Sequence, residues 1–364
     1  MTICLIGKNL TTLMLTKIFI NEGLRVDLYD FNNKKHKKLS NTVSRTIGLS
    51  NDSINFLESQ KILYKKNCWD IKQINLYKGA SLKSFLNFKS EKRCFFMTSY
   101  NNFYKSLDDK VKKSKLFKIK KKNQRISFSD ITKKNYELII TADTNNLFFK
   151  KYFSKQIKKN YKSQAITTTI SHQNLKNNIA EQYFTEFGPL AFLPISSTQT
   201  SIVFSVFDKD LIKDKDKIIK LIERYNRLYD IKNIDILKKF PINLSLSRNY
   251  FYKNILLFGD ALHKIHPLAG QGFNMTLRDA KILSDLIKKN LDLGLSLNTV
   301  LKKFEVERKN SNYIFAMGID FIHEFFKLIN KYDMKSVDHF FKFINKNLFI
   351  KKKIENFANK GFIL

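Results

Sequence analysis

The sequence has few cysteines and no long apolar run. Its three cysteines, Cys4, Cys68 and Cys94, stand far apart and match neither a zinc motif nor a disulfide framework, which favours a reducing compartment. No stretch offers about 18 uninterrupted apolar residues, so we predict no membrane-spanning helix. The apolar N-terminus lacks a basic leader, so we interpret "ICLIGKN" as a strand entering a turn rather than a secretory signal.

Acidic residues are also scarce. The 66 lysines and arginines against 32 acids give a formal net charge of +34. A basic chain can bind nucleic acid, but these lysines are spread along the whole sequence among asparagines, which is typical of a solvated surface. We therefore favour a compositional bias and predict no nucleic-acid partner. Attraction to an anionic membrane surface stays open.

The N-terminal residues follow the pattern of a strand, a helix and a second strand. "ICLIG" is apolar, "KNLTTLMLTKIFINEG" repeats apolar residues at helical spacing, and "LRVDLYD" alternates up to Asp30. This is the order of a dinucleotide-binding βαβ unit, in which phosphates lie on the helix N-terminus and an acid ending the second strand binds the ribose. Asp30 lies 23 residues after Gly7, close to the expected spacing.

The glycine motif of this unit is incomplete. Where G-x-G-x-x-G is expected, the sequence from Gly7 reads "GKNLTT", so only the first glycine is kept. Asn9 can adopt a left-handed conformation, yet its side chain stands where bare backbone should approach a pyrophosphate, and Thr12 would crowd the helix against the strand. These residues alone support a structural βαβ unit without nucleotide as well as they support a binding unit.

The stretch "NILLFGDALHKIHPLAGQGFNMTLRDA" is more specific. An apolar strand ends at Asp260, a loop containing Gly270 and Gly272 follows, and an amphipathic helix begins. Open α/β sheets bind ligands at the carboxyl ends of their strands, and bare amides at a helix N-terminus stabilise anions. Ligand contact is therefore the favoured interpretation of Asp260.

Other polar residues of this stretch have simpler interpretations. His263 and His266 could be metal ligands, but only one acid is nearby and no third imidazole is close in sequence, so we predict no metal site. We interpret His266 as a loop residue that holds the turn. For Arg278 and Asp279, a simple pair on the helix surface stays open.

This stretch resembles the second FAD-binding motif of the class A flavoprotein aromatic monooxygenases, and most closely their ubiquinone-biosynthesis hydroxylase branch, with its Gly-Asp, His-Pro-x-Ala-Gly-Gln-Gly, Asn and Arg-Asp series. "AEQYFTEFGPLAFLP" resembles that branch's substrate-domain strand pair, and "FPINLSLSRNYFYKNILLFGD" its approach to the flavin. "FEVERKNSNYIFAMGIDFIHEFF" resembles its C-terminal helical start. An Asp-Gly motif of the family falls on Asp143 and Thr144, where it is half matched.

The resemblance implies an α/β fold: a Rossmann-like FAD-binding domain of the aromatic hydroxylase type, a β-sheet substrate domain and a C-terminal helical segment. The expected ranges are 1–69, 98–156 and 246–292 for the FAD-binding domain, 70–97 and 157–245 for the substrate domain, and 293–364 for the helical region. Two apolar stripes in that region favour core or dimer contacts over a membrane anchor: Phe321, Phe325 and Ile329, then Val337, Phe341, Ile344 and Leu348.

The resemblance also assigns cofactor contacts. Gly7 would begin the pyrophosphate turn, Asp30 would replace the usual glutamate at the adenosine ribose, and Arg45 would lie near the phosphates and ribityl chain. Asp260, after Gly259, would accept a hydrogen bond from a ribityl hydroxyl. At the flavin itself, Pro267 would lie against the ring edge, Asn274 would support the loop, and backbone amides near N1 and the C2 carbonyl would come from Gly270, Gln271, Gly272 and Phe273.

The implied activity is an FAD-dependent monooxygenase. Reduced FAD would capture O₂ as a C4a-hydroperoxide and hydroxylate the aromatic ring of a polyprenylated ubiquinone precursor, with NADH, NADPH or a protein as electron donor and no nameable catalytic base. The alternative is a non-catalytic scaffold with weakened FAD binding in a ubiquinone-biosynthesis complex. We expect a cytoplasmic protein. Contact with the inner face of the membrane, with other ubiquinone-biosynthesis proteins and with a second copy stays open.

Overall fold

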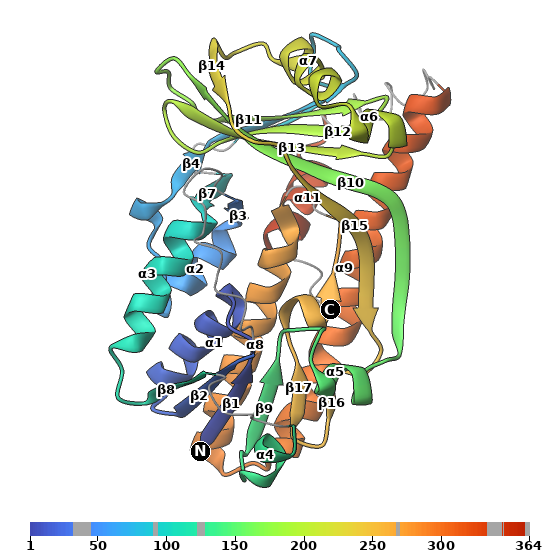
Figure 1. The fold of residues 1–364 in the computed structure, drawn as a ribbon. Helices are drawn as coiled ribbons and strands as arrows, with labels where there is room; N and C mark the ends of the chain where they lie inside the picture. The colour runs from blue at the N-terminus through green and yellow to red at the C-terminus, as the bar shows by residue number, and fades with distance from the viewer. Residues whose placement is uncertain are drawn as a thin grey trace.

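The computed structural model describes residues 1–31, 45–89, 94–121, 128–266, 270–332, 344 and 346–360. Three sheets and a set of long helices organise this part of the chain (Figure 1). The six-stranded sheet, which contains both strands of the N-terminal βαβ unit, lies at the lower end of the view. The nine-stranded sheet lies at the upper end.

The lower sheet has six strands in the order β16-β17-β9-β1-β2-β8. All neighbours are parallel except the β16–β17 hairpin. Its middle strands are apolar on both faces, as expected where helices cover a parallel sheet. The strands are β1 (Thr2–Ile6), β2 (Arg25–Asp30), β8 (Phe117–Lys121), β9 (Leu138–Thr141), β16 (Phe251–Tyr252) and β17 (Ile255–Leu257).

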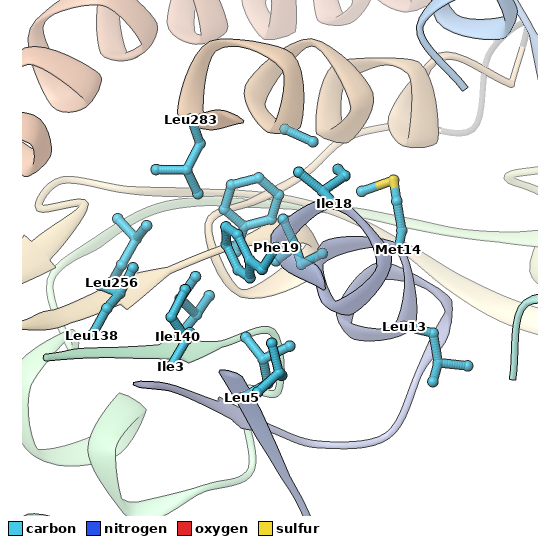
Figure 2. Close-up of a cluster of buried hydrophobic side chains, with 14 of the residues drawn as sticks. Ile3, Leu5, Leu13, Met14, Ile18, Phe19, Leu138, Ile140, Leu256 and Leu283 are labelled. Carbon is cyan, nitrogen blue, oxygen red and sulfur yellow. The ribbon is translucent and has the colours of Figure 1, made fainter. Parts of the chain in front are cut away.

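Two helices, α1 (Leu10–Asn21) and α8 (Gln271–Leu293), pack on this sheet. Figure 2 shows Ile18 and Phe19 of α1 between the strand residues and Leu283 of α8. These side chains are fully buried and contribute to one continuous core. That core fixes both helix N-termini relative to the strand ends. Short helices α4 (Phe128–Lys133) and α5 (Leu147–Tyr152) flank β9 in the sequence.

The upper sheet has nine strands. Its path runs β18-β15-β10-β13-β12-β11-β5-β6, and β14 pairs with β10. Helices α6 (Lys209–Lys213) and α7 (Lys215–Tyr225) cover its outer face. Its strands are β5 (Gln73–Lys78), β6 (Leu86–Lys89), β10 (Gln156–His172), β11 (Ile179–Thr185), β12 (Gly188–Pro194), β13 (Gln199–Val206), β14 (Ile231–Ile234), β15 (Lys238–Ser247) and β18 (His263–Lys264).

A small three-stranded sheet, ordered β3-β7-β4, connects the two larger ones. Thr46 in β3 donates a hydrogen bond from Oγ1 to Ser201 Oγ in β13 of the upper sheet, at 2.9 Å. The elements here are β3 (Thr46–Leu49), α2 (Asn51–Ser59), a 3₁₀ turn (Lys65–Asn67), β4 (Trp69–Ile71), β7 (Phe95–Ser99) and α3 (Tyr100–Lys112).

The C-terminal part is helical, with α9 (Leu297–Tyr332) and α11 (Leu348–Lys360). Within the described residues, none of the helices is both long and apolar enough to cross a bilayer. The predicted stripes differ in burial: Phe321 is 67% exposed, Phe325 is half-buried, and Ile344 is buried. Val337 and Phe341 lie outside the described residues, as do the side chains of Ile329 and Leu348.

Candidate cofactor site

Three loops meet at one edge of the lower sheet. Because β17, β9 and β1 are parallel neighbours, the residues that follow them come together. A Cβ placed on Gly7 would lie 3.2 Å from Cβ of Asp143, and one placed on Gly259 would lie 3.0 Å from Cγ2 of Thr11 in α1. Glycine at these two positions therefore lets the loops approach closely.

The first turn, between β1 and α1, is capped by its own side chains. Asn9 has an extended backbone, with φ of −143°, and its Oδ1 accepts a hydrogen bond from the amide of Thr12 at 3.0 Å. Thr12 Oγ1 accepts one from the amide of Asn9 and donates one to the carbonyl of Gly7. This reciprocal pair is a capping box. The left-handed conformation considered for Asn9 is not adopted, because an N-cap residue needs extended backbone.

The second turn, before α8, has no side-chain cap, and we call it the open turn. Gly270 is left-handed, with φ of 64°, and has no side chain with which to cap the helix. Asn274, one turn further on, is fully buried. Its Nδ2 donates to the carbonyl of Gly48 at 3.0 Å, and its Oδ1 accepts from the amide of Ser50 at 2.9 Å. Asn274 thus fastens the start of α8 to β3 and α2, while the first amides of α8 stay without a side-chain cap from Gly270.

Arg45 and Asp260 lie around a tyrosine at this edge. The Arg45 guanidinium carbon is 5.3 Å from the ring centre of Tyr100, the first residue of α3. Burial raises the pKa of Tyr100, Arg45 opposes that shift, and Asp260 adds to it. Arg45 and Asp260 are themselves exposed. A cation and an acid from distant parts of the sequence therefore lie on either side of Tyr100. No motif marked Tyr100 in the sequence.

Lys8 occupies the other side of the α1 turn. Its Nζ lies 2.9 Å from Oδ1 of Asp108 in α3 and 5.8 Å from the ring centre of Tyr104. Burial raises the pKa of Asp108, but hydrogen bonds from Lys112 and Lys8 outweigh it and lower the pKa. Lys8 was visible in the sequence as a residue of the incomplete motif, whereas its partner on α3 carried no signal.

Asp30, at the end of β2, lies toward the same tyrosines. The pKa of Tyr104 is raised mainly by burial, and Asp30 is one of the charges that raise it further. Asp30 is therefore at the α1 end of the sheet edge.

Arg278 and Asp279 are not a surface pair, because α9 covers this face of α8. Asp279 is fully buried, with Oδ2 at 2.6 Å from His263 Nε2 and Oδ1 at 2.6 Å from Arg308 Nε. Although burial raises the pKa of Asp279, Arg308 and His263 lower it to about 2. His263 is thus engaged with an acid. Over the part of the chain that the structure describes, no group of His, Cys, Asp and Glu is arranged to hold a metal ion.

His266 precedes the open turn and is 1% exposed. Its ring lies on that of His323, with centroids 4.2 Å apart, and neither of its ring nitrogens has a hydrogen-bond partner in the described structure. Burial lowers the pKa of His266 to about 3, and His323 contributes in the same direction. The ring is therefore neutral near neutral pH. Pro267, predicted at the flavin edge, lies outside the described residues.

The two turns fit an FAD molecule unequally. At the α8 end, Gly270 faces Gly48, since a Cβ on Gly270 would lie 3.7 Å from Cα of Gly48, and uncapped amides follow. This combination fits the polar edge of a flat ring. At the α1 end, Asn9 already takes the amide of Thr12, so fewer donors are free for a pyrophosphate. The residues present therefore fit FAD at its flavin end.

Comparison of the sequence with known proteins identifies relatives. A family model described as "Squalene epoxidase" matches residues 230–344. The uncharacterized protein slr1300 of Synechocystis is 30% identical over 174 residues, which cover 46% of this chain and 42% of that protein. Ubiquinone biosynthesis monooxygenase COQ6 of Danio rerio is 25% identical over 227 residues (50% and 47%), and 3-demethoxyubiquinol 3-hydroxylase of Escherichia coli is 28% identical over 180 residues (45% and 44%). The chain spans about half the length of the curated relatives it matches.

Comparison with solved structures identifies the fold. p-Nitrophenol 4-monooxygenase PnpA of Pseudomonas putida matches with a TM-score of 0.78 and 13% identity over all of both chains. Klebsiella pneumoniae HpxO, solved with FAD and uric acid, matches with a TM-score of 0.71 and 13% identity over 99% of this chain and 96% of that one. The fold is thus that of FAD-dependent aromatic monooxygenases, and the predicted fold class is confirmed. The sequence relatives include ubiquinone-biosynthesis hydroxylases, which confirms the predicted resemblance to that branch.

Proposed function

We propose that this chain is an FAD-dependent monooxygenase that hydroxylates the aromatic ring of a polyprenylated ubiquinone precursor. The observation that carries the proposal is the open start of α8, where Gly270 faces Gly48 at the same sheet edge as Asp260. The substrate class is supported by the relatives, which include a ubiquinone biosynthesis monooxygenase and a demethoxyubiquinol hydroxylase.

FAD, when bound and reduced, supplies the activation of O₂, and the chain supplies binding and electrostatics. Amides at the start of α8 stabilise the negative charge of reduced flavin, an effect of up to about 2 kcal/mol for a helix N-terminus. Asp260 accepts a hydrogen bond from the ribityl chain, and Arg45 lies by the phosphates. The full proposed set is Gly7, Asp30, Arg45, Gly259, Asp260, Pro267, Gly270, Gln271, Gly272, Phe273 and Asn274.

The inner face of the upper sheet is proposed to cover the substrate. In β12, Leu190 and Phe192 pack outward in the cluster that includes α7, so only the alternate residues can form the wall expected from "FGPLAFLP". Leu193, on that inner face, pairs with Ser201, which contacts β3 beside Arg45. A ring held between this face and the flavin would be shielded from water. No general base is assigned.

We also propose the domain division predicted from the sequence, with electrons from NADH, NADPH or a protein donor. A cytoplasmic location at the inner membrane face, near other ubiquinone-biosynthesis proteins, belongs to the same proposal. A polyprenyl phenol is soluble in the bilayer, which is the reason to expect the enzyme there.

The test is to purify the full chain, record its flavin absorbance and titrate it with FAD. We expect saturable FAD binding, and O₂ consumption that depends on both a reductant and a prenylated phenol. Saturable FAD binding without phenol-dependent turnover would reject the activity while retaining the cofactor site.

A non-catalytic scaffold is the second candidate function. It is favoured by the capping box at α1 and by Thr144 after Asp143, where the family carries glycine. This candidate predicts weakened FAD binding and no O₂ consumption that depends on the prenylated phenol. The titration and the turnover measurement together therefore separate the two functions.

A further inference from the structure

One row of side chains crosses the inner face of the upper sheet. Strand register aligns residues from strands β10, β13, β12, β11 and β5, which are Thr167, Val203, Ala191, Gln182 and Leu76. Their neighbours along the strands, such as Phe192 and Tyr183, pack outward in the cluster that includes α7. Because side chains alternate along a strand, the aligned residues point to the opposite face, and we call them the inner row.

The inner row lies between two apolar clusters. Ala180, the inner-face residue before Gln182 in β11, belongs to a cluster with Phe95 of the small sheet. Phe184, the inner-face residue after Gln182, belongs to a cluster with Ile265, which lies just before the open turn. Gln182 is therefore placed between the small sheet on one side and the approach to α8 on the other.

Both clusters reach the start of α8. A Cβ placed on Gly270 would lie 3.9 Å from Cζ of Phe95, and one placed on Gly272 would lie 3.8 Å from Cγ1 of Ile265. In Figure 1 the upper sheet lies above the upper end of α8. The inner row therefore faces the turn at which the flavin is proposed to bind.

The middle of the inner row is accessible to solvent. Thr167, Val203 and Ala191 are all partly exposed, although they lie on the face that is turned toward α8. Their side chains are short, so they form a floor beside Gln182 rather than a filled core. Ligand sites of this kind are mostly apolar, with a few polar groups that fix the orientation of the ligand.

Gln182 is the polar group at the edge of this floor. The residue is only 9% exposed, and its side-chain amide makes no hydrogen bond within the part of the chain that the structure describes. Its neighbour Glu181, on the outer face, is fully engaged, since it accepts hydrogen bonds from Tyr77 and Tyr183 at 3.0 and 2.9 Å. A buried polar group without a partner costs about 1–3 kcal/mol. A ligand that supplies the missing partner of Gln182 is therefore favoured at this position.

We propose that the Gln182 side chain binds the phenolic hydroxyl of the substrate, whose ring lies on Ala191 and Val203 and faces the flavin. This inference rests on the proposed function and names the residue that orients its substrate. Oε1 of Gln182 accepts a hydrogen bond from a phenol, and Nε2 donates one to a phenolate, so both protonation states are bound. A ring without the hydroxyl leaves the buried amide unpaired, which gives discrimination against it.

The test is a calorimetric titration of the full chain, saturated with FAD, with ortho-prenylphenol and with prenylbenzene, which lacks the hydroxyl. Wild type should bind the phenol about tenfold more tightly than prenylbenzene. Gln182→Met keeps the length of the side chain and removes its amide, so it should lose this discrimination by binding the phenol about tenfold more weakly. Gln199→Met, exposed at the start of β13, is the matched control and should retain the wild-type affinities.

Equal affinities of wild type for the two ligands, or equal phenol affinities in wild type and Gln182→Met, would overturn the assignment of Gln182 and leave the FAD site intact. If Gln182→Met does not fold, Ala191→Val decides. Its added methyl groups occupy the floor and should weaken both ligands at unchanged FAD affinity, so unchanged ligand affinities would reject the ring position. A chain that binds no FAD would reject the proposed function and this inference with it, a result that the FAD titration gives before any phenol is added.

Discussion

Two helices begin at the same edge of the lower sheet and differ in what their first amides do. At α1, the side chains of Asn9 and Thr12 close a capping box. At α8, the preceding residue is Gly270, which leaves the first turn without a side-chain cap. A capping side chain stabilises a helix by about 1 kcal/mol, but the amide it binds is no longer available to a ligand. A dinucleotide-type turn can therefore lose its glycines, keep its helix and bind phosphate less well.

The two turns are alike in being fixed from outside. Lys8 ties the α1 turn to Asp108 of α3, and Asn274 ties the α8 turn to the backbone of Gly48 and Ser50. Both turns are held by contacts with other elements, and only the α8 turn lacks a side-chain cap. Because only the α8 turn lacks a side-chain cap, we expect most of the cofactor affinity to come from contacts at the start of α8.

The largest expected effect is the pH response of His266, the neutral residue before the open turn. Its pKa of about 3 in the folded chain, set by burial and His323, lies below that of an unfolded histidine. Its contribution is therefore complete above about pH 6.5 and is lost as pH falls toward 3, by roughly 5 kcal/mol in all. Besides His323, Asp320 faces this ring and opposes the shift.

His266→Phe should remove most of that loss, since the unpartnered ring nitrogens give up no hydrogen bond. Urea unfolding from about pH 7 to 4 measures the free energy of unfolding of both proteins. The same steepness in wild type and variant would show that His266 takes up its proton as readily in the folded chain as in the unfolded chain.

The next effect concerns the tie at α8. Asn274→Leu leaves the Ser50 amide and the Gly48 carbonyl without partners, which should lower the free energy of unfolding by roughly 3 kcal/mol. Asn102→Leu, on the exposed side of α3, is the control and should change it by less than about 0.5 kcal/mol. Equal losses would mean that the open turn does not depend on Asn274.

Asp260→Asn tests the proposed cofactor contact in the loop after β17, at the same sheet edge. Loss of a charge-assisted hydrogen bond to the ribityl chain should cost about 1.5–3 kcal/mol, or roughly tenfold to a hundredfold in FAD affinity. Because Asp260 is exposed, stability should hardly change. Asp285→Asn, exposed on α8, is the control. Identical FAD dissociation constants for wild type and Asp260→Asn would remove Asp260 from the site.

The sequence predicted the parts of this fold that depend on local patterns. The βαβ unit and the strand before Asp260 follow from apolar periodicity. The pairing of β11 with β12 was expected only from the family resemblance of "AEQYFTEFGPLAFLP". Contacts between distant segments could not be found that way. Asp279 looked like a surface residue because nothing in its own helix shows that Arg308 of α9 covers it. Tyr100 and Asp108 were missed for the same reason, since α3 carries no motif.

A smaller effect is expected when the closed turn is opened. Asn9→Gly with Thr12→Gly should tighten FAD binding, because backbone amides become free and close approach is restored. The structure adds a cost: without the capping box and with a glycine inside α1, stability should fall by about 1 kcal/mol. FAD titration and urea unfolding of the double variant measure both. Unchanged FAD affinity would show that the α1 amides are not used by the cofactor.

The smallest effect is expected on binding to membranes, in which the proposed polyprenylated substrate would dissolve. The exposed apolar residues Val306 and Phe321 lie on one side of α9, whereas Phe325 is half-buried and stacks on Phe321, and the Phe326 side chain lies outside the described part. Each lysine near an anionic surface contributes about 1 kcal/mol, within a Debye length of roughly 10 Å at about 0.1 M salt. Sedimentation with anionic vesicles should therefore weaken with salt.

Binding to the vesicles should weaken further in Phe321→Ser and Val306→Ser, because serine removes the apolar area that would enter the interface. Leu82→Ser is the matched control: Leu82 is 84% exposed but lies between β5 and β6, away from α9. Equal losses in all three variants would show that exposed apolar residues act without regard to position. A protein that stays in the supernatant at every salt concentration would assign delivery of the phenol to a soluble partner, and the open turn at α8 would then receive its substrate from solution.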